Sequence, residues 1–318
     1  MYAFLLRRLL MMIPVAIGVS VLAFLFQELS PGDALDAMIP PDVAVADADL
    51  EYWRSRLGLD QPAPIRYLHW MGRVLQGDLG YSLTSHQSVG RMILNRLGPT
   101  ALLMAFALLL STVLGIATGV VSAVRQYSWL DYLLTVSAFF WLSVPGFFMG
   151  MLLIYIFAVW LAWVPPFGYS SPGAANVWLD RLHHLLLPGI SLGLELTAAL
   201  TRYVRSSLLE VLGADYIRTA RAKGLSDVVS VLKHGLPNAL IPVISVIGLR
   251  LPALFGGSVV IETVFQWPGM GNMLVNAARS RDYPVVMGVT LFVSVMVVIS
   301  TLLTDIAYAV ADPRIRYH

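Results

Sequence analysis

The sequence predicts an all-α polytopic membrane protein with six transmembrane helices, and two observations lead to this fold class. Of the 318 residues, 58% are hydrophobic and only 13% are charged, whereas soluble domains carry about 25% charged residues. Six apolar segments are also long enough to cross a hydrocarbon core about 30 Å thick. These segments lie at 9–29, 99–123, 132–163, 185–207, 238–261 and 284–310.

The first predicted element covers residues 1–29. Its apolar run is long enough to span a membrane and no small-residue cleavage site follows, so we interpret it as a retained helix rather than a signal peptide. Residues 30–98 form one long extramembrane segment with turn-rich motifs and two short amphipathic stretches. This segment is too short for a separate catalytic domain, so a docking or capping role is expected.

Residues 99–318 are expected to form a five-helix core. The third of the six apolar segments, 132–163, is unusually long and contains Pro145, which predicts either a strong kink or a long, tilted helix. Two separate crossings within 132–163 are an open alternative. Small residues recur at the spacing that lets helices approach closely in lipid. These GxxxG pairs are Gly115 with Gly119, Gly146 with Gly150, and Gly189 with Gly193.

Positive charge predicts the orientation of the six helices. With the N-terminus in the cytoplasm, the two short outer loops hold only Arg181, Arg279 and Arg281. The cytoplasmic side then holds most of the remaining basic residues, which is the distribution that bacterial membrane proteins favour. The arrangement places both termini and the segment 205–237 in the cytoplasm.

Several functions are excluded by residues that the sequence lacks. It has no cysteine, so disulfides, thiolate metal sites and cysteine nucleophiles are excluded. The net charge of +2 gives no indication of a nucleic-acid partner. An ATP-binding P-loop needs Gly-Lys before Ser or Thr, but Lys223 follows alanine and Lys233 follows leucine. Any ATP hydrolysis must therefore come from another subunit, and no metal site is predicted.

Two other classes of protein remain as alternatives. "GISLG" at 189–193 matches a serine-hydrolase pattern around Ser191, although the same residues are a GxxxG packing match. An intramembrane serine hydrolase would depend on Ser191. A proton-coupled secondary carrier would instead depend on Glu195, which lies near the middle of a predicted span.

Glu195 and Arg250 fall at similar predicted depth in the membrane, where an unpaired charge costs several kcal/mol. They either line a polar pathway or form a structural ion pair between two helices. The sequence alone leaves both possibilities open.

The segment 205–237 predicts a helix–turn–helix elbow. Good helix formers continue to Lys223, Gly224 can end that helix, and Ser226 or Asp227 can begin a second short helix. Pro237 then opens the fifth transmembrane helix. The stretch "YIRTARAKGL" (216–225) is basic and rich in small residues. It is either solvated, lies on anionic lipid head groups or docks on a cytoplasmic protein.

This stretch resembles the EAA loop of permeases from binding-protein-dependent ABC importers, in the version of the dipeptide/oligopeptide/nickel branch. Ala220, Gly224, Leu236 and Pro237 occupy matching positions, whereas Arg218 stands where the loop usually has glutamate. The resemblance covers nearly the whole chain. It includes "LLRRLLMMIPV", "LSPGD", "GDLGYS", "LPNALIPV", "GGSVVIETVFQWPGMGNMLVNAARSRDYPVV" and "DIAYAVADPRIRY".

The resemblance implies the first of two paired permease subunits, with the type I ABC importer fold, in the bacterial inner membrane. One or two cytoplasmic ATPase subunits would bind ATP and Mg²⁺, so this chain would need no cofactor, and an extracytoplasmic solute-binding protein would deliver the substrate. Peptides are the expected substrate, with nickel chelates, glutathione or oligosaccharides as alternatives. We expect no nucleic acid among the partners.

The resemblance also implies three groups of functional residues. The ATPase-coupling elbow would comprise Arg218, Thr219, Ala220, Arg221, Ala222, Lys223, Gly224 and Leu225. The polar residues along the pathway would be Glu195, Arg250 and Ser258. The contacts with the binding protein at the outer face would involve Asp78, Tyr81, Glu262, Trp267, Arg281 and Asp282.

Overall fold

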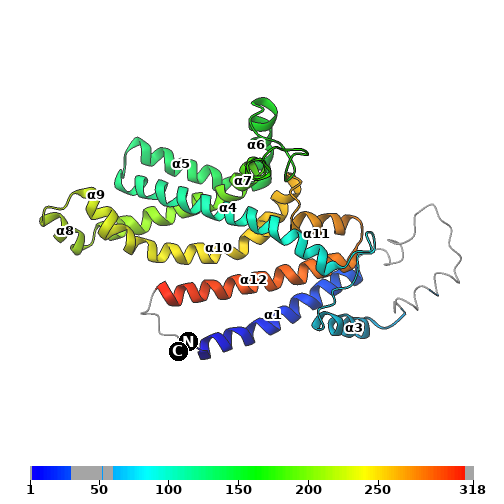
Figure 1. Ribbon diagram of the computed structural model, residues 1–318. Coiled ribbons are helices and arrows are strands. Elements are labelled where there is room, and N and C mark those ends of the chain that lie inside the picture. The colour runs from blue at the N-terminus through cyan, green and yellow to red at the C-terminus, as the bar shows by residue number, and fades with distance from the viewer. Residues whose placement is uncertain (1, 30–51, 53–59, 312–318) are drawn as a thin grey trace. The chain divides into compact units, whose positions relative to one another are not determined.

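The computed structural model describes residues 2–29, 52 and 60–311, and within them the chain is helical apart from turns, loops and one isolated β-bridge (Figure 1). The elements are α1 (Tyr2–Leu29), α3 (Ala63–Leu75), α4 (Val89–Val124), α5 (Trp129–Ser143), α6 (Gly146–Leu153), η1 (Ile154–Trp160), α7 (Val177–Leu212), α8 (Asp215–Ala222), α9 (Asp227–Val229), η2 (Ser230–Gly235), α10 (Leu236–Val264), α11 (Met270–Arg279) and α12 (Tyr283–Ala311). The elements η1 and η2 are π-helical.

The six predicted crossings are confirmed, with the third one broken. Five helices are long and apolar enough to span a membrane, and α5 with α6–η1 makes a sixth when the bent pair counts as one span. The two halves of that pair meet at an angle of 107°. Pro145 precedes α6 and Val144 before it is extended (φ −90°, ψ 125°), because proline disfavours a helical residue immediately before it. The predicted kink at Pro145 is therefore correct.

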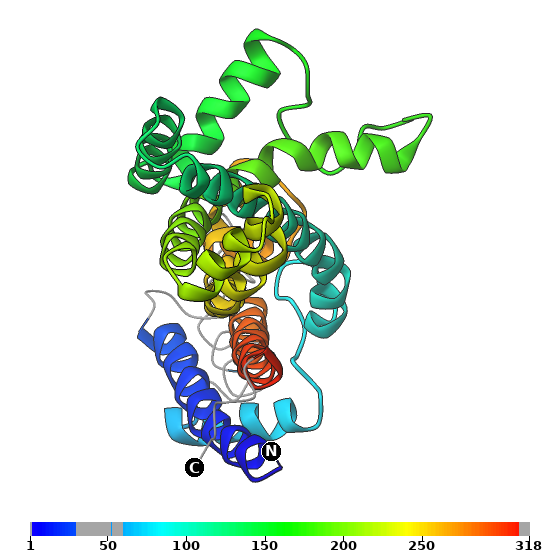
Figure 2. The same ribbon diagram turned by 90° about the vertical axis from the view of Figure 1, so that its left-hand side faces the viewer.

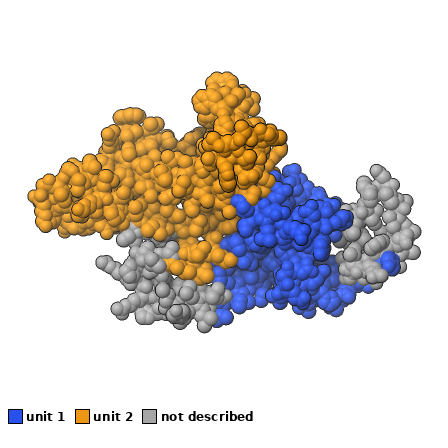
Figure 3. All heavy atoms as spheres, viewed as in Figure 1, with its two compact units in different colours: residues 1–98, 269–298 blue, residues 99–268, 299–318 orange. Residues whose placement is uncertain are grey.

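The chain divides into two compact units, coloured separately in Figure 3. The first unit contains residues 1–98 and 269–298. In this unit α1 packs on α3 through an aromatic cluster of Phe24, Tyr67 and Trp70. Ser20 and Tyr67 also share a hydrogen bond of 2.8 Å between their hydroxyl oxygens. The amphipathic stretch predicted after residue 60 is therefore a helix that buries Trp70.

The second unit contains residues 99–268 and 299–318, and α7 is its central helix. In the most apolar part of α7, 72% of the residues are buried, against 11–33% in the other single-helix spans. The helices α5, α6 and α10 pack against α7. Figure 2 looks from the end where α8 and η2 lie in front of the near ends of α7 and α10.

The glycine pairs predicted to pack helices do so at most of their positions. A Cβ atom at Gly115 or Gly119 of α4 would lie 2.6 Å from the Cβ atom of Leu200 or Val204 of α7, respectively. On α7, a Cβ atom at Gly189 would overlap the Phe106 ring of α4, and one at Gly193 would lie 3.1 Å from the Ala107 carbonyl oxygen. In the third pair Gly150 contacts Phe265, whereas Gly146 has open space around it. Two of the three glycine pairs thus lie where α4 and α7 approach closely.

Candidate coupling elbow and polar sites of the bundle

The segment 205–237 has the predicted helix–turn–helix shape. α7 continues without a break to Leu212, and α8 follows after a short turn. Gly224 has a φ of +85°, and its N–H donates to the Arg221 carbonyl (2.9 Å) while the Leu225 N–H donates to the Ala220 carbonyl (3.3 Å). These two bonds form the glycine-dependent Schellman motif that ends many helices. We refer to residues 213–235 as the elbow.

The two sides of α8 differ in exposure. Ile217 and Ala220 are buried and α8 packs against η2, whereas Arg218, Arg221 and Ala222 are exposed. Thr219, Lys223, Gly224 and Leu225 are exposed as well. The sequence placed Ala220 among the residues that contact a partner, but its side chain points into the elbow. Ala220 therefore packs the elbow, and Ala222 is the small residue presented on its surface.

The basic side chains of the elbow are partly neutralised by acids that flank the "YIRTARAKGL" stretch. Arg218 lies 3.4 Å from Asp215, and Arg221 lies 2.9 Å from Asp227. Such exposed pairs contribute about 0–1 kcal/mol, so they break readily when a partner offers a better carboxylate. Lys223 has no ion pair with any other residue in the part of the chain that the structure describes.

The elbow is joined to the membrane helices by a small apolar core. Leu208 of α7, Val231 of η2 and Ala239 of α10 are buried together with Ala123 of α4. The Ser207 hydroxyl adds a hydrogen bond of 3.0 Å to the Ala239 carbonyl. Because this core connects the elbow to α4, α7 and α10, a force on the elbow reaches the bundle through packed side chains.

A buried ion pair that was not predicted from the sequence lies at the same end of the bundle. Both oxygens of Asp131, in the first turn of α5, accept hydrogen bonds of 2.9 Å from Nε and Nη2 of Arg205 on α7. The Ser122 hydroxyl and the Tyr127 N–H also donate to this carboxylate. A single acid directly before the apolar segment 132–163 was the signal for this site, but its partner is 74 residues away.

Glu195 and Arg250, expected either to line a pathway or to pair, do not form an ion pair. Glu195 is exposed on α7 and Arg250 is half-buried on α10, and neither makes a salt bridge to another described residue. Ser258, also expected along the pathway, is buried, and its hydroxyl donates to the Phe255 carbonyl of its own helix at 2.9 Å.

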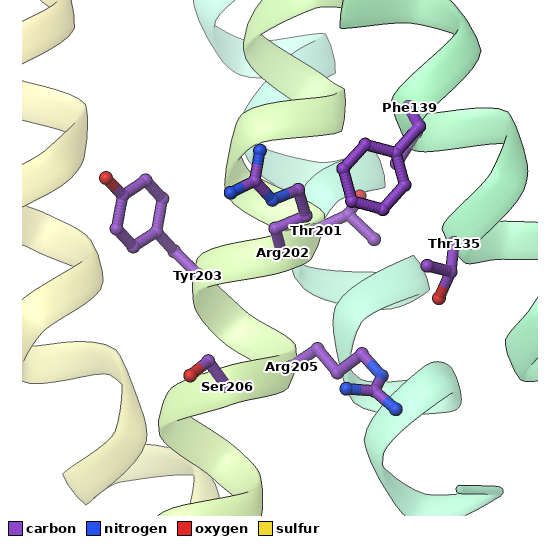
Figure 4. A pocket seen from close by; sticks show the side chains of 8 residues that line it. Thr135, Phe139, Thr201, Arg202, Tyr203, Arg205 and Ser206 are labelled. Carbon is purple, nitrogen blue, oxygen red and sulfur yellow. The ribbon is translucent and has the colours of Figure 1, made fainter. Parts of the chain in front are cut away.

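Arg202 is an exposed cation on α7 that sequence reasoning missed. Its guanidinium carbon lies 5.3 Å from the centre of the Phe139 ring of α5. Both side chains line a groove of about 420 Å³ between α5 and α7, together with Thr135, Thr201, Tyr203, Arg205 and Ser206 (Figure 4). In the sequence, the feature that could have indicated Arg202 is its position among apolar neighbours within a predicted membrane helix.

Three of the six residues expected at the outer face are buried. The Glu262 carboxylate accepts from the Thr100 hydroxyl at 2.7 Å, and Trp267 Nε1 donates to the Pro99 carbonyl at 2.9 Å. The Glu262 and Trp267 side chains are fully buried in the second unit. They cannot contact a binding protein directly in this structure, and the expectation that they do is corrected.

Asp282 is the third buried residue, and it closes a loop within the first unit. Its carboxylate accepts from the Leu83 N–H at 3.0 Å, from the Thr84 hydroxyl at 2.9 Å and from the Ser82 hydroxyl. Asp282 therefore holds the loop instead of meeting a partner. The other three expected residues, Asp78, Tyr81 and Arg281, are exposed.

Ser191 is placed where it packs a helix. Its side chain is buried, and its hydroxyl donates to the Leu187 carbonyl one turn earlier in α7 at 2.8 Å. The nearby His184 is held in the same way by its own helix, with Nδ1 2.9 Å from the Asp180 carbonyl. The GISLG segment thus acts as a packing motif here.

Two family descriptions together match almost the whole chain. Residues 115–317 match the binding-protein-dependent transport system inner membrane component, and residues 1–105 match the N-terminal part of such membrane components. The chain belongs to this family of ABC importer permeases. It is a multi-pass protein of the inner membrane, as the sequence predicted.

Named relatives of this permease extend over its full length. It is 43% identical to the oligopeptide transport system permease protein AppB of Bacillus subtilis, over all of both chains. It is 41% identical to the glutathione transport system permease protein GsiC of Escherichia coli K12, also over all of both chains. The resemblance to the dipeptide/oligopeptide branch of permeases is therefore confirmed.

The fold of the permease matches that of a solved importer. Structural comparison pairs 70% of this chain with 96% of a chain from an inward-facing MetNI methionine ABC transporter, with a TM-score of 0.54 and 17% identity. This similarity supports the predicted type I ABC importer fold.

Proposed function

We propose that this permease forms, with a second homologous permease, the membrane pathway of an ATP-driven peptide importer. A solute-binding protein delivers the peptide at the outer face, and cytoplasmic ATPase subunits hydrolyse ATP. The full-length similarity to an oligopeptide permease supports peptides as substrates. The similarity to a glutathione permease favours the same class, because glutathione is itself a tripeptide.

The elbow is the observation that carries this proposal. It presents Arg218, Arg221 and Lys223 beside the small Ala222 on its surface, and buries Ile217 beneath them. A short exposed helix with this surface fits a groove lined by carboxylates. Because the permease sequence has no P-loop lysine, such a contact is the route by which work from ATP hydrolysis reaches the pathway.

The apolar core beneath the elbow transmits movement of the ATPase subunits to the membrane helices. Closure of the ATPase subunits pushes the elbow, and the core of Leu208, Val231 and Ala239 passes the movement to α7 and α10. Packed interfaces of this kind change between discrete arrangements, which is the behaviour needed for alternating access. The proposal places both termini in the cytoplasm, on the elbow side.

Import by the reconstituted complex tests this function. The permease pair and its ATPase subunits are placed in proteoliposomes, with ATP inside and the peptide-loaded binding protein outside. We expect peptide uptake that requires hydrolysable ATP, stops with vanadate and continues after a protonophore is added. Uptake that needs a proton gradient and no ATP would instead show a secondary carrier.

Gly224 offers a more specific test of coupling. A Cβ atom there would meet no atom within 4 Å, so a substitution acts through the backbone, which has a φ of +85°. Valine disfavours that conformation by about 1–2 kcal/mol, whereas asparagine adopts it more readily. We expect Gly224→Val to lower the peptide imported per ATP hydrolysed while the complex still assembles, and Gly224→Asn to retain most of the coupling. Equal coupling in both variants and the wild type would exclude the elbow as the transmitter.

A further inference from the structure

The central helix α7 opens to its surroundings along a narrow polar stripe. Glu195, Arg202 and Ser206 are exposed on it, although α7 is the most enclosed of the single-helix spans. They are spaced by seven and four residues, so at about 100° per residue they lie within about 40° of one another around the helix axis. The open side of α7 therefore carries one acid, one base and a hydroxyl in a row.

The two charges on this stripe have no oppositely charged partner among the described residues. Arg205, one turn beyond Arg202, is fully occupied by Asp131, whereas Arg202 only stacks on the Phe139 ring. Glu195 forms no salt bridge with a described residue. Figure 4 shows Arg202 with its guanidinium group beside the Phe139 ring, and Arg205 further along the same helix.

The combination of an acid and a base favours a water-filled pathway over a lipid surface. A lipid phosphate could pair with Arg202, but Glu195 on the same stripe would then face hydrocarbon or the same anionic head group. Unpaired charges within membrane spans are costly and almost always face a bundle interior or a water-filled cavity. The stripe therefore fits the wall of a water-filled pathway better than a lipid-facing surface.

The spacing of the two charges matches a short peptide with free termini. Seven residues of helix place the Cα atoms of Glu195 and Arg202 about 10 Å apart. An extended chain of two to four residues spans about 7–14 Å. Each long side chain can adjust its reach by several ångströms.

We propose that Arg202 binds the terminal carboxylate of the passing peptide and Glu195 binds its terminal ammonium group. The α7 stripe is then a zwitterion-selective site inside the pathway. The inference rests on the proposed peptide-import function and deepens it by naming the substrate chemistry. It favours zwitterionic peptides over uncharged oligosaccharides, which offer neither group.

Import of matched peptides tests this site in the reconstituted complex. Wild type is compared with Arg202→Gln, Arg202→Lys and Glu195→Gln, with His183→Gln, an exposed polar residue of α7 outside the stripe, as the control. The probes are a tripeptide with free termini, the same tripeptide amidated at its C-terminus and the same tripeptide acetylated at its N-terminus. Each is supplied at a concentration that saturates the binding protein, whose affinity for each probe is measured separately.

We expect Arg202→Gln to lower import of the free tripeptide by about tenfold, the effect of losing one charged hydrogen-bonded pair. Import of the amidated peptide should change little, so that the wild-type preference for the free carboxylate disappears. Arg202→Lys should retain most of the preference, and His183→Gln should match wild type in peptide import and in ATP hydrolysis without binding protein. Glu195→Gln should lower import of the free tripeptide but spare an N-acetylated version.

Three results would overturn the inference. The first is that Arg202→Gln and Glu195→Gln both import the free and blocked peptides in the same ratio as wild type. The second is an equal loss for free and blocked peptides, which would mean a structural role. The third is an Arg202 effect that vanishes when anionic lipids are omitted from the vesicles, which would assign Arg202 to a lipid phosphate. Failure of the wild-type complex to import any peptide with ATP would instead overturn the proposed function, and the inference with it.

Discussion

The tight contact of α4 with α7 at Gly119 predicts that one added methyl group destabilises the second unit. A Cβ at this position would lie 2.6 Å from Val204 Cβ and 2.9 Å from the Thr201 carbonyl oxygen. Carbon atoms pack best at about 3.5–4.0 Å, so the two helices must separate locally by about 1 Å. Overpacking of this kind costs about 1–3 kcal/mol.

The separation should also weaken an interhelical hydrogen bond. The hydroxyl oxygens of Thr118 and Thr201 lie 2.7 Å apart, and a bond of this type within a membrane bundle contributes about 0.6 kcal/mol. The expected loss for Gly119→Ala is therefore about 1.5–3.5 kcal/mol, with the larger share from overpacking.

Thermal unfolding of the purified permease complex in detergent, followed by tryptophan fluorescence, measures this loss. Gly119→Ala should unfold several degrees below wild type. Gly256→Ala on α10 is the matched control, because a Cβ there meets nothing within 4 Å. If Gly119→Ala unfolds at the wild-type temperature, or if Gly256→Ala is equally destabilised, the packing argument is wrong.

Three further substitutions follow from buried polar contacts. Arg205→Met should destabilise the permease by about 3–5 kcal/mol, because it leaves the Asp131 carboxylate buried without its cation; size-exclusion recovery should improve when Asp131→Asn is added. Asp282→Ala should strip the donors of Ser82, Leu83 and Thr84 of their acceptor and speed amide hydrogen exchange in the loop it holds, whereas Asp282→Asn should have a smaller effect. Trp267→Phe should lower thermal stability by about 1–3 kcal/mol, because the buried indole loses its hydrogen bond to the Pro99 carbonyl, and an unchanged melting temperature would refute that assignment.

Local backbone chemistry explains what could be predicted from the sequence. The kink follows from Pro145, whose ring excludes a helical residue before it. The end of α8 follows from Gly224, and the start of α9 from Ser226, whose hydroxyl accepts from the Val229 N–H at 3.4 Å. Each of these signals acts within a few residues, so it is visible in a single sequence.

The direction of each polar side chain depended on contacts between distant segments. Asp131 bonds to Arg205, and Trp267 bonds to the Pro99 carbonyl. The partners in each pair are far apart in the sequence, so no local pattern of residues predicts them. Ala220 turns inward because α8 packs on η2, although the sequence alone permits either side to face out. The elbow's shape was thus predictable, whereas its exposed surface had to come from the structure.

Site-specific cross-linking at Lys223 tests the central claim, that the elbow docks on the ATPase subunits, most directly. The permease has no cysteine, so Lys223→Cys can carry a photo-cross-linker as its only thiol adduct, attached before the complex is assembled. Tyr81→Cys, exposed and expected at the outer face, is the control. We expect the label at position 223 to capture the ATPase subunit, with a yield that changes between ATP and vanadate-trapped states. Capture of the ATPase from position 81, or none from position 223 in an active complex, would contradict it.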